Sequence, residues 1–136
     1  MRRFFLFLLI ACLPGLALAE EALVFIAYGG LPKTEQATLQ RLFTGRVVSI
    51  GELAAAPVNY PPGHPLRERF LAAIMGQTEE QYTGYWLVRR YVGKGAPPLV
   101  LPDVDAVVGH VMTTPGAVGY LPASKVPAGA NVIFKR

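Results

Sequence analysis

The apolar residues of the chain fall into short continuous runs and helically spaced stripes. Residues 22–28 form an unbroken apolar run that is too short for an ordinary helix and ends at Gly29-Gly30, which predicts a buried strand. Residues 117–121, which follow a Pro-Gly turn, form a second predicted strand. Shorter strand candidates lie at 46–50, 58–60, 99–101 and 132–134.

Two helices are predicted in the first half of the chain. One begins at Thr34, whose hydroxyl can cap it, and ends at Gly45, where a left-handed residue is favoured. Its apolar face carries Leu39, Leu42 and Phe43. The other follows Pro61-Pro62-Gly63 and stops at Gly76, and its apolar positions are Leu66, Phe70, Ala73 and Ile74.

Two more helices are predicted in the second half. Residues 78–91 start with Thr78 as the cap, place acidic side chains in the first turn and end with Arg89 and Arg90, as the helix dipole favours. The aromatic residues of this helix, interpreted as core packing rather than a ligand platform, are Tyr82, Tyr85, Trp86 and Tyr91. Asp103 caps the last helix, whose apolar face carries Val104, Val107, Val108 and Val111. Strands that alternate with helices predict an α/β fold, a layered sheet flanked by helices.

The first residues have the features of a secretory signal peptide. Arg2 and Arg3 precede an apolar run over 4–13, and an Ala-Leu-Ala cleavage site ends at Ala19. Cys12 resembles the lipid-bearing cysteine of a lipoprotein, but only 11 residues would precede that cut, so cleavage after Ala19 is preferred. Residues 1–19 are therefore expected to be removed, and 20–136 to form a single exported domain. No later apolar segment approaches the length of a membrane-spanning helix.

The charge balance excludes one class of partner. The formal charge is +4, from 13 basic and 9 acidic residues, and removing Arg2 and Arg3 leaves 11 against 9, a charge of +2. Proteins that bind nucleic acids usually carry a far stronger basic excess. We therefore expect no nucleic-acid partner.

The inventory of reactive groups is small. Beyond the predicted signal the chain has no cysteine and only His64 and His110, so a zinc site of the common type is not expected. Asp103 and Asp105 could hold a hard cation, but Asp103 is better explained as a helix cap. No paired acid and base groups are indicated. We expect neither an enzyme nor a metal or other cofactor.

Anion binding has a better physical basis. Gly63, His64 and Arg67 surround the start of the second helix, where unpaired backbone N–H groups and the positive end of the dipole favour phosphate or sulfate. Arg67 could add a charge-assisted hydrogen bond. The loop 29–34 offers glycines, a lysine and the hydroxyl of Thr34, so Thr34 is a fourth candidate ligand residue, and the loop is either a partial second contact with the anion or simply a turn and cap.

Four segments together resemble a known family. They are LQRLFTGR (39–46), GHPLRERF (63–70), YWLVRRYVGKGAPP (85–98) and TPGAVGYL (114–121). In this order they are similar to the small single-lobe relatives of the phosphate-binding proteins that serve ABC importers, named phosphate ABC transporter substrate-binding protein-like or PBP-domain proteins. The resemblance covers most of the chain after residue 22. It implies one lobe of a type II periplasmic binding protein and a location in the Gram-negative periplasm.

The resemblance also implies where a ligand would bind. In the two-lobed phosphate binders, the segment that starts at Gly63 resembles a Gly-Ser-Gly-Thr-Arg stretch followed by phenylalanine. Gly63, Arg67 and Phe70 match this pattern, whereas His64-Pro65-Leu66 replaces two hydroxyls and one glycine. Since Pro65 has no N–H and the hydroxyls are lost, the expected function is weak capture of phosphate or another oxyanion, with closure by a second copy or a partner such as an ABC importer. The alternative is a non-catalytic periplasmic interaction module that binds an envelope protein and has lost the ligand.

Overall fold

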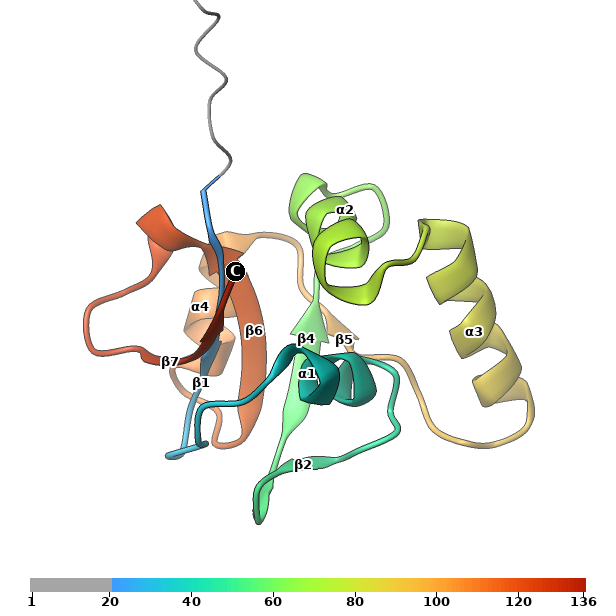
Figure 1. The fold of residues 1–136 in the computed structure, drawn as a ribbon, viewed down its shortest axis with the longest axis horizontal. Coiled ribbons are helices and arrows are strands. Elements are labelled where there is room, and N and C mark those ends of the chain that lie inside the picture. Colours follow the sequence, from blue (N-terminus) through green and yellow to red (C-terminus); the bar gives the residue numbers. More distant parts are fainter. Residues whose placement is uncertain (1–20) are drawn as a thin grey trace, which may run out of the picture.

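The computed structural model describes residues 21–136 (Figure 1). The predicted signal peptide and Cys12 lie outside the described residues. The elements in chain order are β1 (Leu23–Ala27), α1 (Gln36–Phe43), β2 (Ser49–Ile50), β3 (Leu53–Ala54), β4 (Ala56–Asn59), α2 (Pro65–Phe70), the π-helical turn η1 (Leu71–Met75), α3 (Glu79–Tyr91), β5 (Leu99–Val100), α4 (Val104–Val111), β6 (Ala117–Pro122), the 3-10 turn η2 (Ala123–Lys125) and β7 (Asn131–Lys135).

A five-stranded mixed sheet forms the centre of the domain. Its strand order is β5-β4-β6-β1-β7. β4 is parallel to β5 and to β6, whereas β1 is antiparallel to both β6 and β7. Because β1 is antiparallel to β4, the chain leaves these two strands at opposite ends of the sheet. In Figure 1, α2 lies beyond one end of β4, and the loop after β1 lies at the other end of the sheet.

Helices cover both faces of this sheet, which confirms the predicted layered α/β fold. On one face, Phe25 of β1 lies with its ring centroid 6.0 Å from Phe43 of α1 and 6.1 Å from Phe70 of α2. On the other face, α4 packs closely against Gly119 of β6, where an added Cβ would lie 2.7 Å from Val107. The valine face predicted for α4 is confirmed, with Val107 and Val111 fully buried.

The start of α1 differs from the prediction. The helix begins at Gln36, and the capping position is held by Glu35, whose side chain makes no capping hydrogen bond. Thr34 instead donates its backbone N–H to the carbonyl of Ile133, at 2.9 Å. This contact beside β7 keeps Thr34 out of the capping position, so the predicted cap was wrong. The predicted end of the helix is confirmed, because Gly45 has a φ of +70°.

The second helix contains a π-helical turn that moves its buried face. Phe70 and Ile74 are buried as predicted, but Ala73 is exposed and Leu71 is buried instead. The wider turn of η1 rotates the residues after Phe70 relative to a regular α-helix. The predicted stop at Gly76 is confirmed, since its φ is +62°.

Two strand predictions were too long or incomplete. Of residues 46–50, only the last two form β2, which pairs with the unpredicted β3 in a small hairpin. The strand predicted at 58–60 is β4, which starts two residues earlier and stops at Asn59. Tyr60 leaves the strand because its N–H bonds to the side chain of Asn59 rather than to a neighbouring strand.

The third helix is anchored on the end of α1. The hydroxyl of Tyr82 and the indole N–H of Trp86 both donate to the carbonyl of Phe43, at 2.7 and 3.3 Å. The Tyr85 hydroxyl donates to the carbonyl of Thr44, so α3 satisfies carbonyls that the end of α1 leaves without helical partners. The core role predicted for the aromatic residues is confirmed for Tyr82 and Trp86 but wrong for Tyr91, which is 92% exposed.

Gly45 lets these two helices meet, and we expect Gly45→Ala to lower the free energy of unfolding by about 2 to 4 kcal/mol. The positive φ strains any other residue, and the new Cβ would lie 2.7 Å from Cη2 of Trp86. Urea unfolding followed by the fluorescence of Trp86, the sole tryptophan, measures the effect. Gly93→Ala is the matched control, because Gly93 has a φ of +74° but open space around it. Equal losses in the two variants would contradict the role of the Trp86 contact.

Candidate functional site

The start of α2 holds three of the four predicted site residues. Gly63 has a φ of +86° and turns the chain from β4 towards the helix. His64 is the N-cap residue, and its Nδ1 accepts the backbone N–H of Leu66 at 3.1 Å. Pro65, the first helical residue, has no N–H to donate. The protein's own imidazole therefore takes a donor that an oxyanion would need, and the ring is held by stacking on Tyr60, 4.4 Å away between centroids.

Arg67 is buried and paired. Its Nε donates a hydrogen bond to Oε2 of Glu79 at 3.0 Å, and its Nη2 lies 2.9 Å from Oε1 as an ion-pair contact. Its Nη1 donates to the backbone carbonyl of Tyr60 at 3.0 Å, and its guanidinium lies over the Tyr82 ring, 5.3 Å from the centroid. The side chain of Arg67 is only 8% exposed. An anion that approached this helix would meet a cation whose charge is already balanced.

The first turn of α3 positions Glu79. Thr78 and Gln81 form a reciprocal capping box, with hydrogen bonds of 3.1 and 3.0 Å, that fixes where α3 begins. Gly76 turns the chain sharply just before this start. The carboxylate of Glu79 thus benefits both from the positive end of the α3 dipole and from Arg67.

Buried tyrosines form a hydrogen-bonded network next to the Arg67–Glu79 ion pair. The Tyr60 hydroxyl donates to the carbonyl of Tyr120 at 2.7 Å, and the Tyr120 hydroxyl donates to Oδ1 of Asn59. Burial raises the pKa of Tyr60, Tyr82 and Tyr120 above the ordinary tyrosine value, and the charge of Asp103 adds to the rise at Tyr60. These phenols stay protonated at physiological pH. They serve as hydrogen-bond donors and not as bases.

The fourth predicted site residue lies elsewhere. Thr34 lies beside the edge strand β7, where its backbone N–H bonds to the carbonyl of Ile133, whereas Gly63 follows β4, which is three strands away in the sheet. The structure does not bring Thr34 to the start of α2. Sequence reasoning also missed Glu79, Tyr60 and Asn59 as neighbours of Arg67. The only available signal was the acidic first turn of α3, which has an ordinary local explanation.

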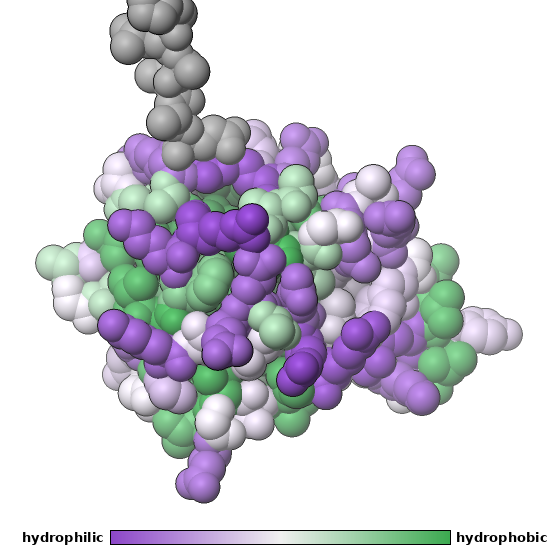
Figure 2. Space-filling view, in the orientation of Figure 1, coloured by the Kyte–Doolittle hydropathy of each residue, from purple (hydrophilic) through white to green (hydrophobic). Residues whose placement is uncertain are grey.

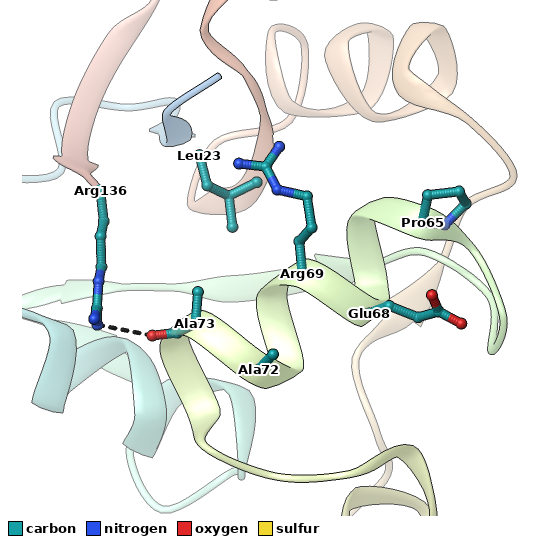
Figure 3. A pocket seen from close by; sticks show the side chains of 7 residues that line it. All are labelled: Leu23, Pro65, Glu68, Arg69, Ala72, Ala73 and Arg136. Atoms are coloured by element: carbon teal, nitrogen blue, oxygen red, sulfur yellow. Dashed lines mark hydrogen bonds between the residues drawn. The ribbon is translucent and has the colours of Figure 1, made fainter. Parts of the chain in front are cut away.

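Two cavities border this region. A cavity of about 590 Å³ lies between α2 and the ends of β1 and β7 (Figure 3) and is lined by Leu23, Pro65, Glu68, Arg69, Ala72, Ala73 and Arg136. Arg136 donates to the Ala73 carbonyl at 2.7 Å, and Arg69 donates to the Glu21 carbonyl, so both arginines tie chain segments together. A second cavity, of about 190 Å³, lies between α3 and β4 and is lined almost entirely by apolar surface. Neither presents a cluster of unpaired cations to an anion.

Across residues 21–136, no group of three or more His, Cys, Asp or Glu side chains is placed to hold a metal ion. Asp103 accepts the backbone N–H of Ala106 at 2.8 Å, which confirms it as the cap of α4. Within the same span, every helix is too short or too polar to cross a bilayer.

Comparison with known proteins identifies the fold. No family model and no curated protein matches the sequence. Among solved structures, the chain is similar to an ABC-type phosphate transport receptor from Vibrio cholerae, with a TM-score of 0.66 and 20% sequence identity. The match covers 85% of this chain and 46% of the receptor, so the chain spans about half the receptor's length. The fold is that of one lobe of a periplasmic binding protein, as the sequence resemblance implied.

Proposed function

We propose that this protein is an exported, non-catalytic domain that uses a single phosphate-receptor-type lobe to bind an envelope protein rather than to capture phosphate. The observation that carries the proposal is the ion pair between buried Arg67 and Glu79. This ion pair and the cap formed by His64 place the protein's own groups where the sequence resemblance implied that an oxyanion would bind.

The energetics support a ligand-free lobe. Phosphate at the start of α2 would add negative charge beside Glu79, whose carboxylate oxygens lie about 3 Å from the guanidinium. Strong oxyanion sites need several convergent donors, and the chain offers few because Pro65 has none and the Leu66 N–H is taken. The likeness to a transport receptor favours a binding role over catalysis. We further propose that residues 1–19 direct export to the periplasm and that 20–136 form the working domain.

Weak oxyanion binding, with an ABC importer as partner, is the second candidate. The observation that favours it is that some N–H groups of the Arg67 guanidinium are not used by hydrogen bonds within the described residues. A guanidinium has five N–H groups, and the hydrogen bonds to Glu79 and Tyr60 use one on Nε and one on Nη1, which leaves N–H groups on Nη1 and Nη2 without a hydrogen-bond acceptor among residues 21–136. An oxyanion that reached these N–H groups would bind without displacing Glu79.

Calorimetric titration with phosphate, with sulfate as the control anion, separates the two candidates. For an interaction module we expect no saturable heat, which means a Kd weaker than about 1 mM. Glu79→Gln should then create phosphate binding, because it leaves the charge of Arg67 unbalanced. Glu80→Gln is the matched control, since Glu80 is the exposed neighbour on the same helix turn. Saturable, phosphate-selective heat in the unmodified protein would overturn the module proposal in favour of a weak receptor.

A further inference from the structure

The outer face of α3 is apolar and uncovered. Leu87, Val88 and Tyr91 are 69%, 63% and 92% exposed, and Val92 continues the surface just beyond the helix. Figure 2 shows an apolar patch at the side of the molecule where α3 lies in Figure 1. The inner face of the same helix is fixed by the buried side chains of Tyr82 and Trp86, so the outer face is presented in one orientation. Exposed apolar patches of this kind mark interaction surfaces in soluble proteins.

Gly84 gives this face a notch. It lies in the middle of α3, it is exposed, and a Cβ built there would meet nothing within 4 Å. Glycine in a helix interior is costly relative to alanine, and no contact within residues 21–136 requires it here. Small residues at this kind of position let a second helix approach closely. The notch therefore points to a helical partner.

The spacing along the helix defines a seam. Glu80, Gly84, Leu87 and Tyr91 are separated by four, three and four residues and are all exposed, the pattern of a helix that packs along a second helix. Charges of opposite sign lie at its two ends, because Glu80 belongs to the seam in the first turn and Arg90 flanks it beside Tyr91 in the last. A helix with this polarity is complementary to itself when the two copies run antiparallel.

One antiparallel register satisfies the shape and the charges together. If the crossing point lies midway between Gly84 and Leu87, Leu87 of each copy faces the Gly84 notch of the other. Tyr91 then faces Glu80, and Arg90 lies one residue along from that carboxylate. The same contacts occur twice about a two-fold axis, as in an isologous interface.

We propose that two copies of this chain associate through α3, with Leu87 of each copy seated on Gly84 of the other and Glu80 paired with Arg90 across the axis. A second copy is the expected partner because, in the antiparallel orientation, Leu87 of one copy fits Gly84 of the other and Glu80 of one copy lies near Arg90 of the other. The start of α2 and α3's outer face involve different side chains, so self-association does not depend on the phosphate result.

Light scattering and sedimentation of the purified protein test the proposal. We expect a concentration-dependent dimer, and we expect Leu87→Lys to raise its dissociation constant at least about tenfold, because a charge would replace the central apolar contact. Val48→Lys is the matched control, since Val48 is 74% exposed but lies outside α3, and it should leave the dimer intact. A protein that stays monomeric at high concentration, or a dimer unaffected by Leu87→Lys, would overturn the proposal.

A charge exchange tests the antiparallel register. Glu80→Arg and Arg90→Glu, made singly, should each weaken the dimer at moderate salt, because like charges then meet across the axis. The double variant should recover most of the original dissociation constant. Both positions are exposed, so folding is preserved and circular dichroism checks it. A double variant weaker than either single variant would rule out this self-pairing and would favour an unrelated envelope protein on the same face.

Discussion

Arg67→Ala is expected to lower the free energy of unfolding by about 3 to 5 kcal/mol, the usual cost of breaking a buried ion pair by removing one partner. The change leaves Glu79 without its cationic partner and the carbonyl of Tyr60 without a donor. It also removes the cation that lies over the Tyr82 ring. Urea unfolding followed by the fluorescence of Trp86 measures the loss.

Two controls show whether the ion pair causes this effect. Arg90→Ala removes an exposed arginine and should change stability by no more than about 0.5 kcal/mol. Replacing both partners, with Arg67→Met and Glu79→Leu, should recover much of the loss, because apolar groups of similar volume need no partner. Unchanged stability in Arg67→Ala alone would contradict a stabilising pairing of Arg67 with Glu79.

This result also affects how phosphate experiments are designed. Because Arg67 supports the fold, a loss of phosphate heat in Arg67→Ala would not by itself locate a binding site. Glu79→Gln is the better probe, since it changes the charge around Arg67 while keeping a similar shape. It should bring a smaller loss of stability than Arg67→Ala, because the amide oxygen of glutamine can still accept a hydrogen bond from Arg67.

Alkaline pH is expected to unfold the domain. Burial raises the pKa of Tyr60, Tyr82 and Tyr120 above the value of about 10 that tyrosine has in an unfolded chain. Above that pH the unfolded state loses protons that the folded state keeps, so stability falls as pH rises. Each such tyrosine contributes up to about 1.4 kcal/mol per pH unit, or about 4 kcal/mol for the three together. With a typical stability of about 5 to 15 kcal/mol, the fold should be lost between about pH 11 and 14.

Tyrosinate absorbance and circular dichroism, followed together, check this expectation. Ionisation of the three buried phenols should coincide with the loss of secondary structure. Tyr60→Phe should lower the dependence of stability on pH by about one third, because one of the three groups is removed. Complete ionisation of all six tyrosines in a folded protein would contradict the buried network.

Much of the local structure was predictable because its causes are local. The cap at Thr78, the charges at the two ends of α3 and the cap at Asp103 are each set by side chains within one helical turn. Gly45 and Gly76 end their helices by adopting a backbone conformation that glycine reaches without strain. Such signals predict where helices begin and end.

The candidate site was predicted only in part. Gly63, His64 and Arg67 do meet at the start of α2, because neighbours along the chain stay neighbours in space. Their chemistry was misjudged, since the partner of Arg67 is Glu79, twelve residues away and on another helix. No periodicity or spacing indicates that a carboxylate from the next helix neutralises this arginine.

By itself, the sequence determined the α/β class, the ends of most helices and the apolar faces of α1 and α4. Only the tertiary structure decided that β1 runs antiparallel to β6, and that Thr34 lies beside β7 rather than at Gly63. The tertiary structure also decided that η1 buries Leu71 rather than Ala73, and that Arg67 is paired inside the protein. The physical reason is that caps and amphipathic faces depend on residues a few positions apart, whereas strand direction and ion pairing depend on which distant segments share the same core.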